Sequence, residues 1–395
     1  MFAEVLLAIL FFVYPLGQLE RIPLGSPEIG FYCHDIIIGL LLFYWLGRKI
    51  IKKEKIKLHK FGQYILFFGS IAFFSYLINI PKRTGSEIFI AGLYLIRWLA
   101  YSSLYFVLQD LKIRQLFNCS IVQLLIVVGS VAAGFGILQY IFYPDIRPLT
   151  AFEWDPHYYR VVGTYLEPGF AGLIFILTMV LIVEKCWAKN LKTQFTIYYL
   201  LFTIIYIAFA LTYSRSAYLA YLLAMSIIAW VKKSWKFLLF TLLIFALTLY
   251  ILPHPSGEGV KLERQYTFWS RFASWQNGLK IWSDYPIFGV GFNFYRYAAR
   301  DYGFLGKNWI SSHAGAGVDN SFLFVLSTTG LVGLSLYFWL LGTILVASYK
   351  NIKKSANLMI FISFAICGIH ANFNNTLFYP WIMIWLWVLL GAYGA

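Results

Sequence analysis

The chain has 395 residues, of which 60% are hydrophobic and only 12% are charged, and its formal net charge is +15. An average soluble domain has about 25% charged residues, so this composition excludes a protein whose whole surface faces water. The apolar residues form long continuous runs without an alternation of period two, which argues against a membrane barrel. The sequence therefore predicts an all-α, polytopic integral membrane protein.

A membrane helix needs roughly 20 predominantly apolar residues. In chain order we expect about 12 such helices, at residues 2–19, 29–46, 61–80, 88–108, 116–143, 167–183, 195–211, 217–231, 235–252, 322–349, 356–373 and 378–393. The first run has no basic stretch and no small-residue cleavage pattern, so we expect a retained helix and not a signal peptide. Residues 1–395 are predicted to form a single membrane domain.

Lysine and arginine are concentrated in alternate connections between the predicted helices. If the N-terminus is cytoplasmic, the cytoplasmic connections hold 18 of the 32 basic residues and four of the 17 acidic ones. Basic loops mark the cytoplasmic side of a membrane protein. We therefore expect a multi-pass protein of the cytoplasmic (inner) membrane with both termini in the cytoplasm. The basic loops are interpreted as topology signals that contact membrane lipids, and no nucleic-acid partner is expected.

Two outer connections are long, residues 144–166 and the large extracytoplasmic loop 253–321 between helices 9 and 10. Both are rich in aromatic residues, which argues against disorder and favours a binding role. Within the larger loop, one face of a predicted helix carries Arg264, Phe268, Arg271, Trp275 and Trp282. This face is compatible with an amphipathic helix in the headgroup layer and with a cover over a phosphate or sugar site.

Two charged residues at the outer ends of predicted helices are candidates for chemistry. Arg215 lies in a very short outer connection, where it either snorkels or reaches a lipid phosphate; its neighbours favour the second role. Asp319 precedes the tenth helix and is compatible with a helix cap and with a proton acceptor. His313, six residues upstream, could accept the proton instead.

Three further residues have weaker signals. Glu167 opens the sixth helix as a structural acid or as the partner of a loop arginine. His370 is expected to form hydrogen bonds between helices at the outer end of the eleventh helix. Arg97 lies inside the fourth helix, where a cation indicates either an ion pair or a function.

The four cysteines are scattered, and we find no nucleotide-binding loop and no zinc-ligand spacing. We therefore expect no cofactor and no metal, and a substrate that arrives already activated on a lipid at the outer face.

The second half of the chain, residues 165–393, resembles the O-antigen ligase and polymerase superfamily. The resemblance rests on the order of several short motifs: TYSRSA at 212–217, Arg271 followed by Trp275, Pro286 with GVGF at 289–292, DNSFL at 319–323, TGLVG at 329–333, and the segment from Ile369 to Pro380. Each motif is short, and their combination in this order is the specific feature.

This resemblance implies a metal-independent glycosyltransferase that acts on undecaprenyl-diphosphate-linked glycans in the synthesis of bacterial surface polysaccharide. Family arginines hold the diphosphate, a role that falls here on Arg215 and Arg271. In the ligases a histidine occupies the position of Asp319, and this departure makes a polymerase the first choice. Asp319, or failing it His313, would then take the proton from the attacking hydroxyl.

The remaining residues that we expect to bind the diphosphate or the glycan are Arg264, Arg160, Glu167, Trp275, Asn320 and His370. Expected partners are the lipid-linked glycan and membrane lipids, with a chain-length regulator or a flippase as further candidates. A ligase that moves a finished glycan to a lipid or protein acceptor is the alternative enzyme. A lipid-glycan transporter is the alternative of another class, although no internal repeat supports it.

Overall fold

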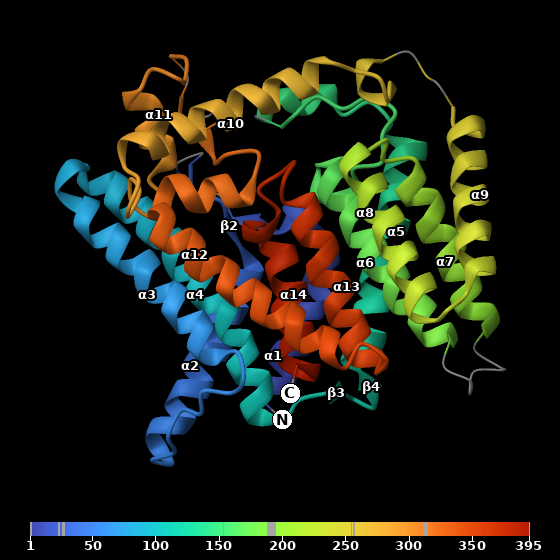
Figure 1. Ribbon diagram of the computed structural model, residues 1–395, viewed down its shortest axis with the longest axis horizontal. Coiled ribbons are helices and arrows are strands. Elements are labelled where there is room, and N and C mark those ends of the chain that lie inside the picture. Colours follow the sequence, from blue (N-terminus) through green and yellow to red (C-terminus); the bar gives the residue numbers. More distant parts are fainter. Residues whose placement is uncertain are drawn as a thin grey trace.

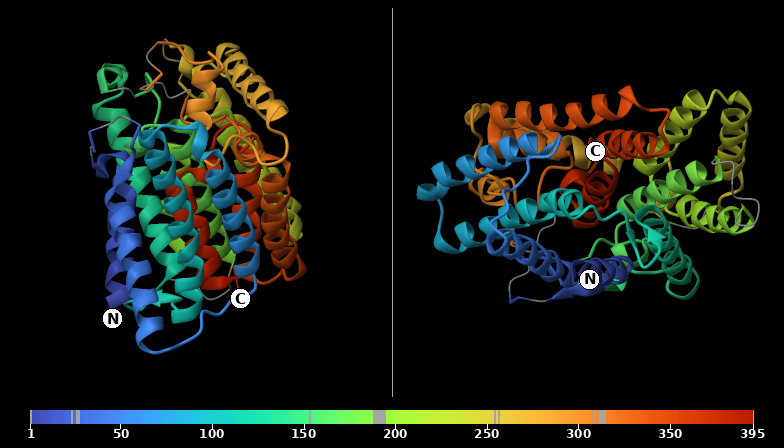
Figure 2. Two further views of the ribbon diagram at one scale, coloured as in Figure 1. Left: turned by 90° about the vertical axis from the view of Figure 1, so that its left-hand side faces the viewer. Right: turned by 90° about the horizontal axis from the view of Figure 1, so that it is seen from below.

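The computed structural model describes residues 2–22, 24–25, 28–152, 154–187, 195–253, 255, 257–307, 309–310 and 315–394. It is all-α apart from two pairs of very short antiparallel strands, β1 (Arg21–Ile22) with β2 (Phe31–Tyr32) and β3 (Gln115–Leu116) with β4 (Cys119–Ser120). Most helices run along one common direction, and both termini lie at the same end of the bundle (Figures 1 and 2).

Each of the twelve predicted segments overlaps one helix of this bundle. These helices are α1 (Phe2–Val13), α2 (Cys33–Ile51), α3 (Gly62–Asn79), α4 (Gly85–Leu111), α5 (Ile121–Phe142), α6 (Pro168–Trp187), α7 (Phe195–Ala210), α8 (Arg215–Val231), α9 (Trp235–Ile251), α12 (Ser321–Lys350), α13 (Ser355–His370) and α14 (Pro380–Tyr393). The first is shorter than predicted, because the chain continues from α1 as a 3₁₀ helix, Tyr14–Glu20, with Pro15 near its start.

Six helical stretches among the described residues are long and apolar enough to cross a membrane: Phe2–Glu20, Gly62–Lys82, Gly85–Leu111, Ile121–Phe142, Pro168–Trp187 and Ser321–Lys350. Five shorter helices, α7, α8, α9, α13 and α14, are also apolar. These features are those of a polytopic membrane protein. A total of twelve crossings stays a prediction.

Helices α6 and α14 form the centre of the bundle. In α14, every residue from Pro380 to Ala392 is buried, and α6 is buried from Ala171 to Glu184. Such helices are apolar on all sides and differ from the outer helix α9, of which only Thr241 and Phe245 are buried. Figure 1 accordingly shows α14 surrounded by other helices and α9 at the edge of the molecule.

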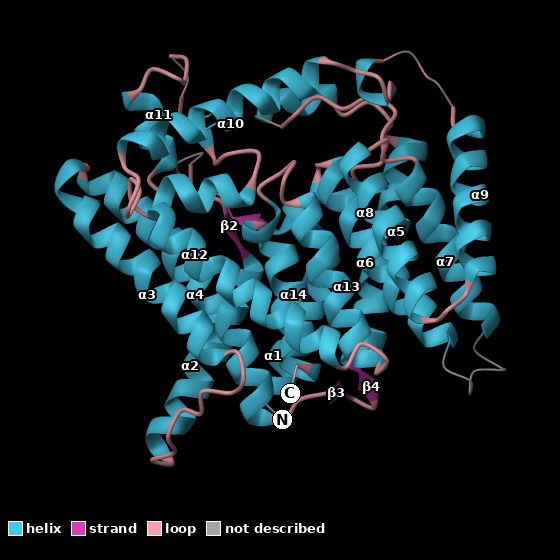
Figure 3. Cartoon of the chain, in the orientation of Figure 1, coloured by secondary structure: helices cyan, strands magenta, loops and turns pink. Residues whose placement is uncertain are grey.

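The long segment between α9 and α12 is folded. It contains α10 (Tyr266–Asp284) and α11 (Tyr295–Asp301), which lie across the end of the bundle opposite to the two termini (Figures 1 and 3). The helix predicted from the stripe of arginine and aromatic residues is therefore present as α10. Arg264 is an exception, because it precedes the first residue of this helix.

A glycine-dependent contact fixes the chain after α10 to α12. The amides of Val290 and Gly291 donate to the carbonyl oxygens of Ser327 and Thr328 (3.0 and 2.9 Å). The amide of Leu331 donates to the carbonyl oxygen of Pro286 (2.9 Å). Gly289 and Gly330 have φ of +66° and +67°. A Cβ at Gly330 would lie 2.1 Å from the oxygen of Ile287, and one at Gly289 2.4 Å from the carbonyl carbon of Thr328. We call this contact between residues 286–291 and 327–332 the glycine clasp.

Arg97 forms an ion pair inside the bundle, between α4 and α2. Its Nε and Nη2 donate to the two carboxylate oxygens of Asp35 (2.8 and 2.6 Å), and Tyr101 donates to the same carboxylate (2.7 Å). Both charged side chains are about one-tenth exposed. Of the two roles that the sequence left open for Arg97, the structure gives it the ion pair.

We expect Arg97→Met to lower the free energy of unfolding by about 3–5 kcal/mol, because Asp35 would keep a buried charge without its partner. Thermal unfolding in detergent measures this loss. Arg147→Met is the matched control: Arg147 pairs with Asp145 at 2.6 Å, but its side chain is 57% exposed, so we expect a change below about 1 kcal/mol. Equal unfolding midpoints for the two variants would contradict this account of the pair.

Candidate functional site

Arg215 is held by the segment that precedes α10. It is the first residue of α8, after the N-cap Ser214. Its Nη1 donates to the carbonyl oxygens of Leu262 and Arg264 (3.2 and 3.1 Å), and its Nη2 donates to Thr267 Oγ1 (2.7 Å). Arg215 therefore does not extend freely into solvent. Thr267 was not predicted, although it lies four residues before Arg271 and so on the same face of α10.

Two more arginines converge on the connection between α7 and α8. Arg160, which is 7% exposed, donates through Nε to the carbonyl oxygen of Thr212 (2.9 Å). Arg264 donates to the carbonyl oxygen of Tyr213 (3.3 Å), and its buried Nε has no hydrogen-bond partner among the described residues. Backbone carbonyls thus take the place of carboxylates around both guanidinium groups.

Arg160, Arg215, Arg264 and Arg271 together form the arginine pocket. Among the described residues, none of the four forms an ion pair with a carboxylate. Burial lowers the pKa of Arg264 to about 9, and the positive charges of the other three add to this effect. Burial likewise lowers the pKa of Arg160 to about 10, partly offset by the negative charge of Glu167. The four groups are close enough to repel one another, which favours the binding of an anion between them.

A cavity of about 290 Å³ opens beside these side chains. It is lined by Arg215, Ser216, Leu219, Phe268, Arg271, Phe272, Trp275 and Phe373. One end is cationic, whereas Leu219, Phe268 and Phe272 are apolar and exposed on the outside of the protein. A larger groove of about 470 Å³ lies at the other end of α12, between Lys60 and Lys350, and has no contact with the arginine pocket.

His370 is fully buried between helices, as the sequence indicated. Its Nδ1 lies 2.7 Å from Thr376 Oγ1, and its Nε2 lies 3.1 Å from Ser216 Oγ and 3.4 Å from Asn374 Nδ2. Both ring nitrogens are therefore engaged. Arg271 joins this network through one long hydrogen bond, 3.5 Å, to Asn374 Oδ1.

Asp319 lies at the start of α12 but does not cap it. Asn320 is the N-cap, and its side-chain oxygen accepts from the amides of Phe322 and Leu323 (2.8 and 3.0 Å). The capping role considered for Asp319 is thus filled by its neighbour. The backbone of Asp319 is bonded to α10, because its carbonyl oxygen accepts from Trp275 Nε1 (3.0 Å) and its amide donates to Ser274 Oγ (3.1 Å).

The carboxylate of Asp319 has no hydrogen-bond or ion-pair partner among the described residues. Burial raises its pKa to about 6, the nearby charges of Glu167 and Asp155 act in the same direction, and Arg271 opposes them. A carboxylate with such a pKa is suited to accept a proton near neutral pH. His313, the other predicted proton acceptor, lies outside the described residues.

Glu167 lies immediately before α6 and next to the arginine pocket. Its Oε1 accepts from the amide of Gly169 (3.0 Å), and its Oε2 lies 3.4 Å from His157 Nε2. The loop arginine Arg160 interacts with it through charge, without a direct ion pair among the described residues. The predicted residues that the structure describes come from five separate parts of the chain and meet at one end of the bundle, below α10.

One known family matches part of the second half of the chain. Residues 198–338 match the model of the O-antigen ligase family. The resemblance is thereby confirmed. The O-antigen ligase region runs from α7 into α12 and contains Arg215, Arg264, Arg271 and Asp319, whereas Arg160, Glu167 and His370 lie outside it. No curated protein matches the chain significantly. The O-antigen ligase match supports a ligase- or polymerase-type, glycosyltransferase-like activity in a membrane protein.

An anion that binds the arginine pocket should stabilise the fold, since it relieves repulsion that the folded state alone contains. We expect inorganic pyrophosphate to raise the unfolding temperature, by an amount that corresponds to about 2.7 kcal/mol at one hundred times the dissociation constant. Arg271→Ala should reduce this shift with little effect on the fold, because Arg271 makes only the one long hydrogen bond to Asn374. Arg147→Ala, at the exposed arginine, should leave it unchanged. An unaltered shift in Arg271→Ala would argue against pyrophosphate binding at this pocket.

Proposed function

We propose that the protein polymerises undecaprenyl-diphosphate-linked oligosaccharide repeat units at the outer face of the cytoplasmic membrane. The observation that supports this proposal best is a cluster of four arginines that form no ion pair with a carboxylate among the described residues. One of them, Arg271, acts on the carboxylate of Asp319, which has no hydrogen-bond or ion-pair partner in the described part of the chain. The first feature suits a diphosphate, and the second suits the activation of a hydroxyl group.

In the proposed reaction, a sugar hydroxyl of the acceptor attacks the anomeric carbon of the donor. A new carbon–oxygen bond forms as the bond to the diphosphate oxygen breaks, and the lipid diphosphate leaves with the bonding electrons. Asp319 takes the proton of the hydroxyl. Arg215 and Arg271 hold the diphosphate and stabilise the charge that develops on it, a contribution that does not require a metal ion.

The aromatic residues of α10 are assigned to the glycan and the lipid. Trp275 lines the cavity next to Arg271 and is oriented by its hydrogen bond to the backbone of Asp319. Aromatic faces stack on sugar rings, so Trp275 is placed to contact the sugar that carries the diphosphate. The exposed Phe268 and Phe272 lie on the side from which a polyprenyl chain would extend into the bilayer.

Ligation is the second candidate, because the matching family is that of the O-antigen ligase. A ligase would use the same donor and the same leaving group, and would differ only in the acceptor. The two activities are therefore separated by their products. We favour polymerisation because Asp319 stands at the position where the ligases have a histidine.

Purified protein in lipid nanodiscs, incubated with undecaprenyl-diphosphate-linked repeat units, should give a ladder of products that differ by one repeat unit. Arg271→Ala and Asp319→Asn should each reduce the rate by at least about 100-fold, whereas Asp319→Glu should retain measurable activity. Gel electrophoresis of the glycans measures chain length, and Arg147→Ala serves as the control. A single transfer to a foreign acceptor would establish the ligase instead, and full activity in both variants would refute the site.

The rate should also depend on pH through Asp319. Its pKa is raised to about 6, and only the ionised form accepts a proton, so kcat/KM should fall about tenfold for each pH unit below 6 and level off above it. The positive charge of Arg271 lowers the pKa of Asp319. The residual activity of Arg271→Gln should therefore begin to fall at a higher pH than the activity of the wild type does. A rate that does not change between pH 5 and 7 would exclude Asp319 as the base.

A further inference from the structure

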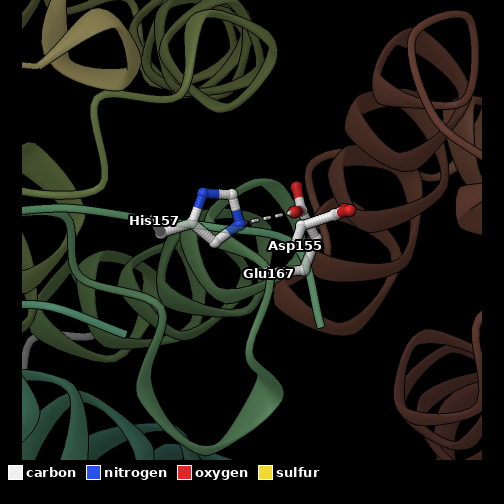
Figure 4. A group of neighbouring side chains, drawn as sticks. All are labelled: Asp155, His157 and Glu167. Carbon is white, nitrogen blue, oxygen red and sulfur yellow. Dashed lines mark ion pairs between the residues drawn. The ribbon is translucent and has the colours of Figure 1, made fainter. Parts of the chain in front are cut away.

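Three side chains that could bind a metal ion meet at the outer end of α6. Asp155 and His157 come from the connection between α5 and α6, and Glu167 immediately precedes α6 (Figure 4). One donor atom of each residue lies within 4.8 Å of the donor atoms of the other two. The spacings of two and ten residues match no common metal-binding motif, so a metal site here could not be predicted from the sequence.

His157 and Glu167 approach each other closely, but the imidazole nitrogen that faces the carboxylate forms no hydrogen bond among the described residues. His157 Nε2 lies 3.4 Å from Glu167 Oε2, but this buried nitrogen has no hydrogen bond of acceptable geometry among the described residues. A neutral imidazole whose Nε2 carries no proton would present a lone pair to a carboxylate oxygen. Two acceptors face each other stably only when a positive charge lies between them, either a proton or a metal ion.

The distance between these two atoms agrees with joint coordination. Ligand atoms about 2.0–2.1 Å from a tetrahedral Zn²⁺ are about 3.3–3.4 Å apart, and the observed separation is 3.4 Å. The other oxygen of Glu167 is occupied by the amide of Gly169, which leaves Oε2 for an ion. Asp155 is exposed, so its carboxylate can rotate to supply the third ligand.

The backbone holds His157 in place without help from an ion. The amide of Ile146 donates to the carbonyl oxygen of His157 (3.1 Å), and the amide of Tyr159 donates to that of Pro144 (2.9 Å). Asp145 and Tyr158 form an antiparallel bridge between these two bonds. Two of the three ligands are therefore positioned before an ion binds, since Glu167 is likewise fixed by Gly169.

We propose that Asp155, His157 and Glu167 bind one divalent transition-metal ion, of the type of Zn²⁺ or Mn²⁺, with water completing its coordination. An imidazole ligand favours these ions over Ca²⁺ and Mg²⁺, which prefer ligands that are all oxygen. The two carboxylates balance the charge of the ion. The ion connects residues 155–157 to the start of α6; it has no part in the transfer reaction proposed above, so binding and transfer are tested separately.

The test measures, by titration calorimetry, the binding of Zn²⁺ and of Mn²⁺ to metal-free, full-length protein in detergent. We expect one ion per chain for the wild type. His157→Ala and Asp155→Asn should bind at least about tenfold more weakly, because even outer partners of metal ligands change affinity by that much. Two variants are the matched controls and should bind the ion as the wild type does. Asp145→Asn changes a carboxylate of the same connection, and His59→Ala changes a histidine that lies just before α3.

Bound ion should also raise the unfolding temperature of the wild type and not that of His157→Ala. The pyrophosphate-dependent shift in the same variant confirms that it is folded. Absence of binding to the wild type would overturn the proposal. Unchanged binding in both His157→Ala and Asp155→Asn would overturn it too, because the ion would then occupy another site.

Discussion

The central constraint on this structure is the concentration of positive charge at one end of an apolar bundle. Arg160, Arg215 and Arg264 donate to backbone carbonyls of the connection between α7 and α8 and of the segment before α10. Carbonyl oxygens accept hydrogen bonds from these guanidinium groups but do not cancel the charges, and the Nε of Arg264 has no partner among the described residues. The fold therefore tolerates an electrostatic cost at this end that an anionic ligand would relieve. Strain of this kind is common at functional sites and is held in place by the surrounding packing.

Most of the helices could be predicted from the sequence because each lies in a continuous apolar run between polar connections. The predictions failed where backbone geometry overrides composition. The first run ends early as an α-helix at Val13, before a proline, and the rest of it is a 3₁₀ helix. The glycine clasp could not be predicted either, since it depends on the close approach of two segments about 40 residues apart and not on a local pattern.

The candidate site could be predicted in part. Motif order identified Arg215, Arg271 and Asp319, and helical spacing identified α10. Spacing could not show that Arg264 precedes that helix, or that Asn320 rather than Asp319 caps α12, because adjacent residues compete for one capping position. The approach of His157 to Glu167 arises from the path of an irregular loop, which no periodicity encodes.

The attachments of α10 have a consequence for how large molecules approach the site. Arg215 contacts its first turn, the backbone of Asp319 is bonded to its middle at Trp275, and the glycine clasp fixes the chain that follows it. Swinging α10 away would break all three attachments together. We therefore expect α10 to stay in place over the arginines as one unit. In the proposed reaction, a lipid-linked donor would then reach the arginines laterally, by diffusion in the plane of the bilayer, past the exposed Leu219.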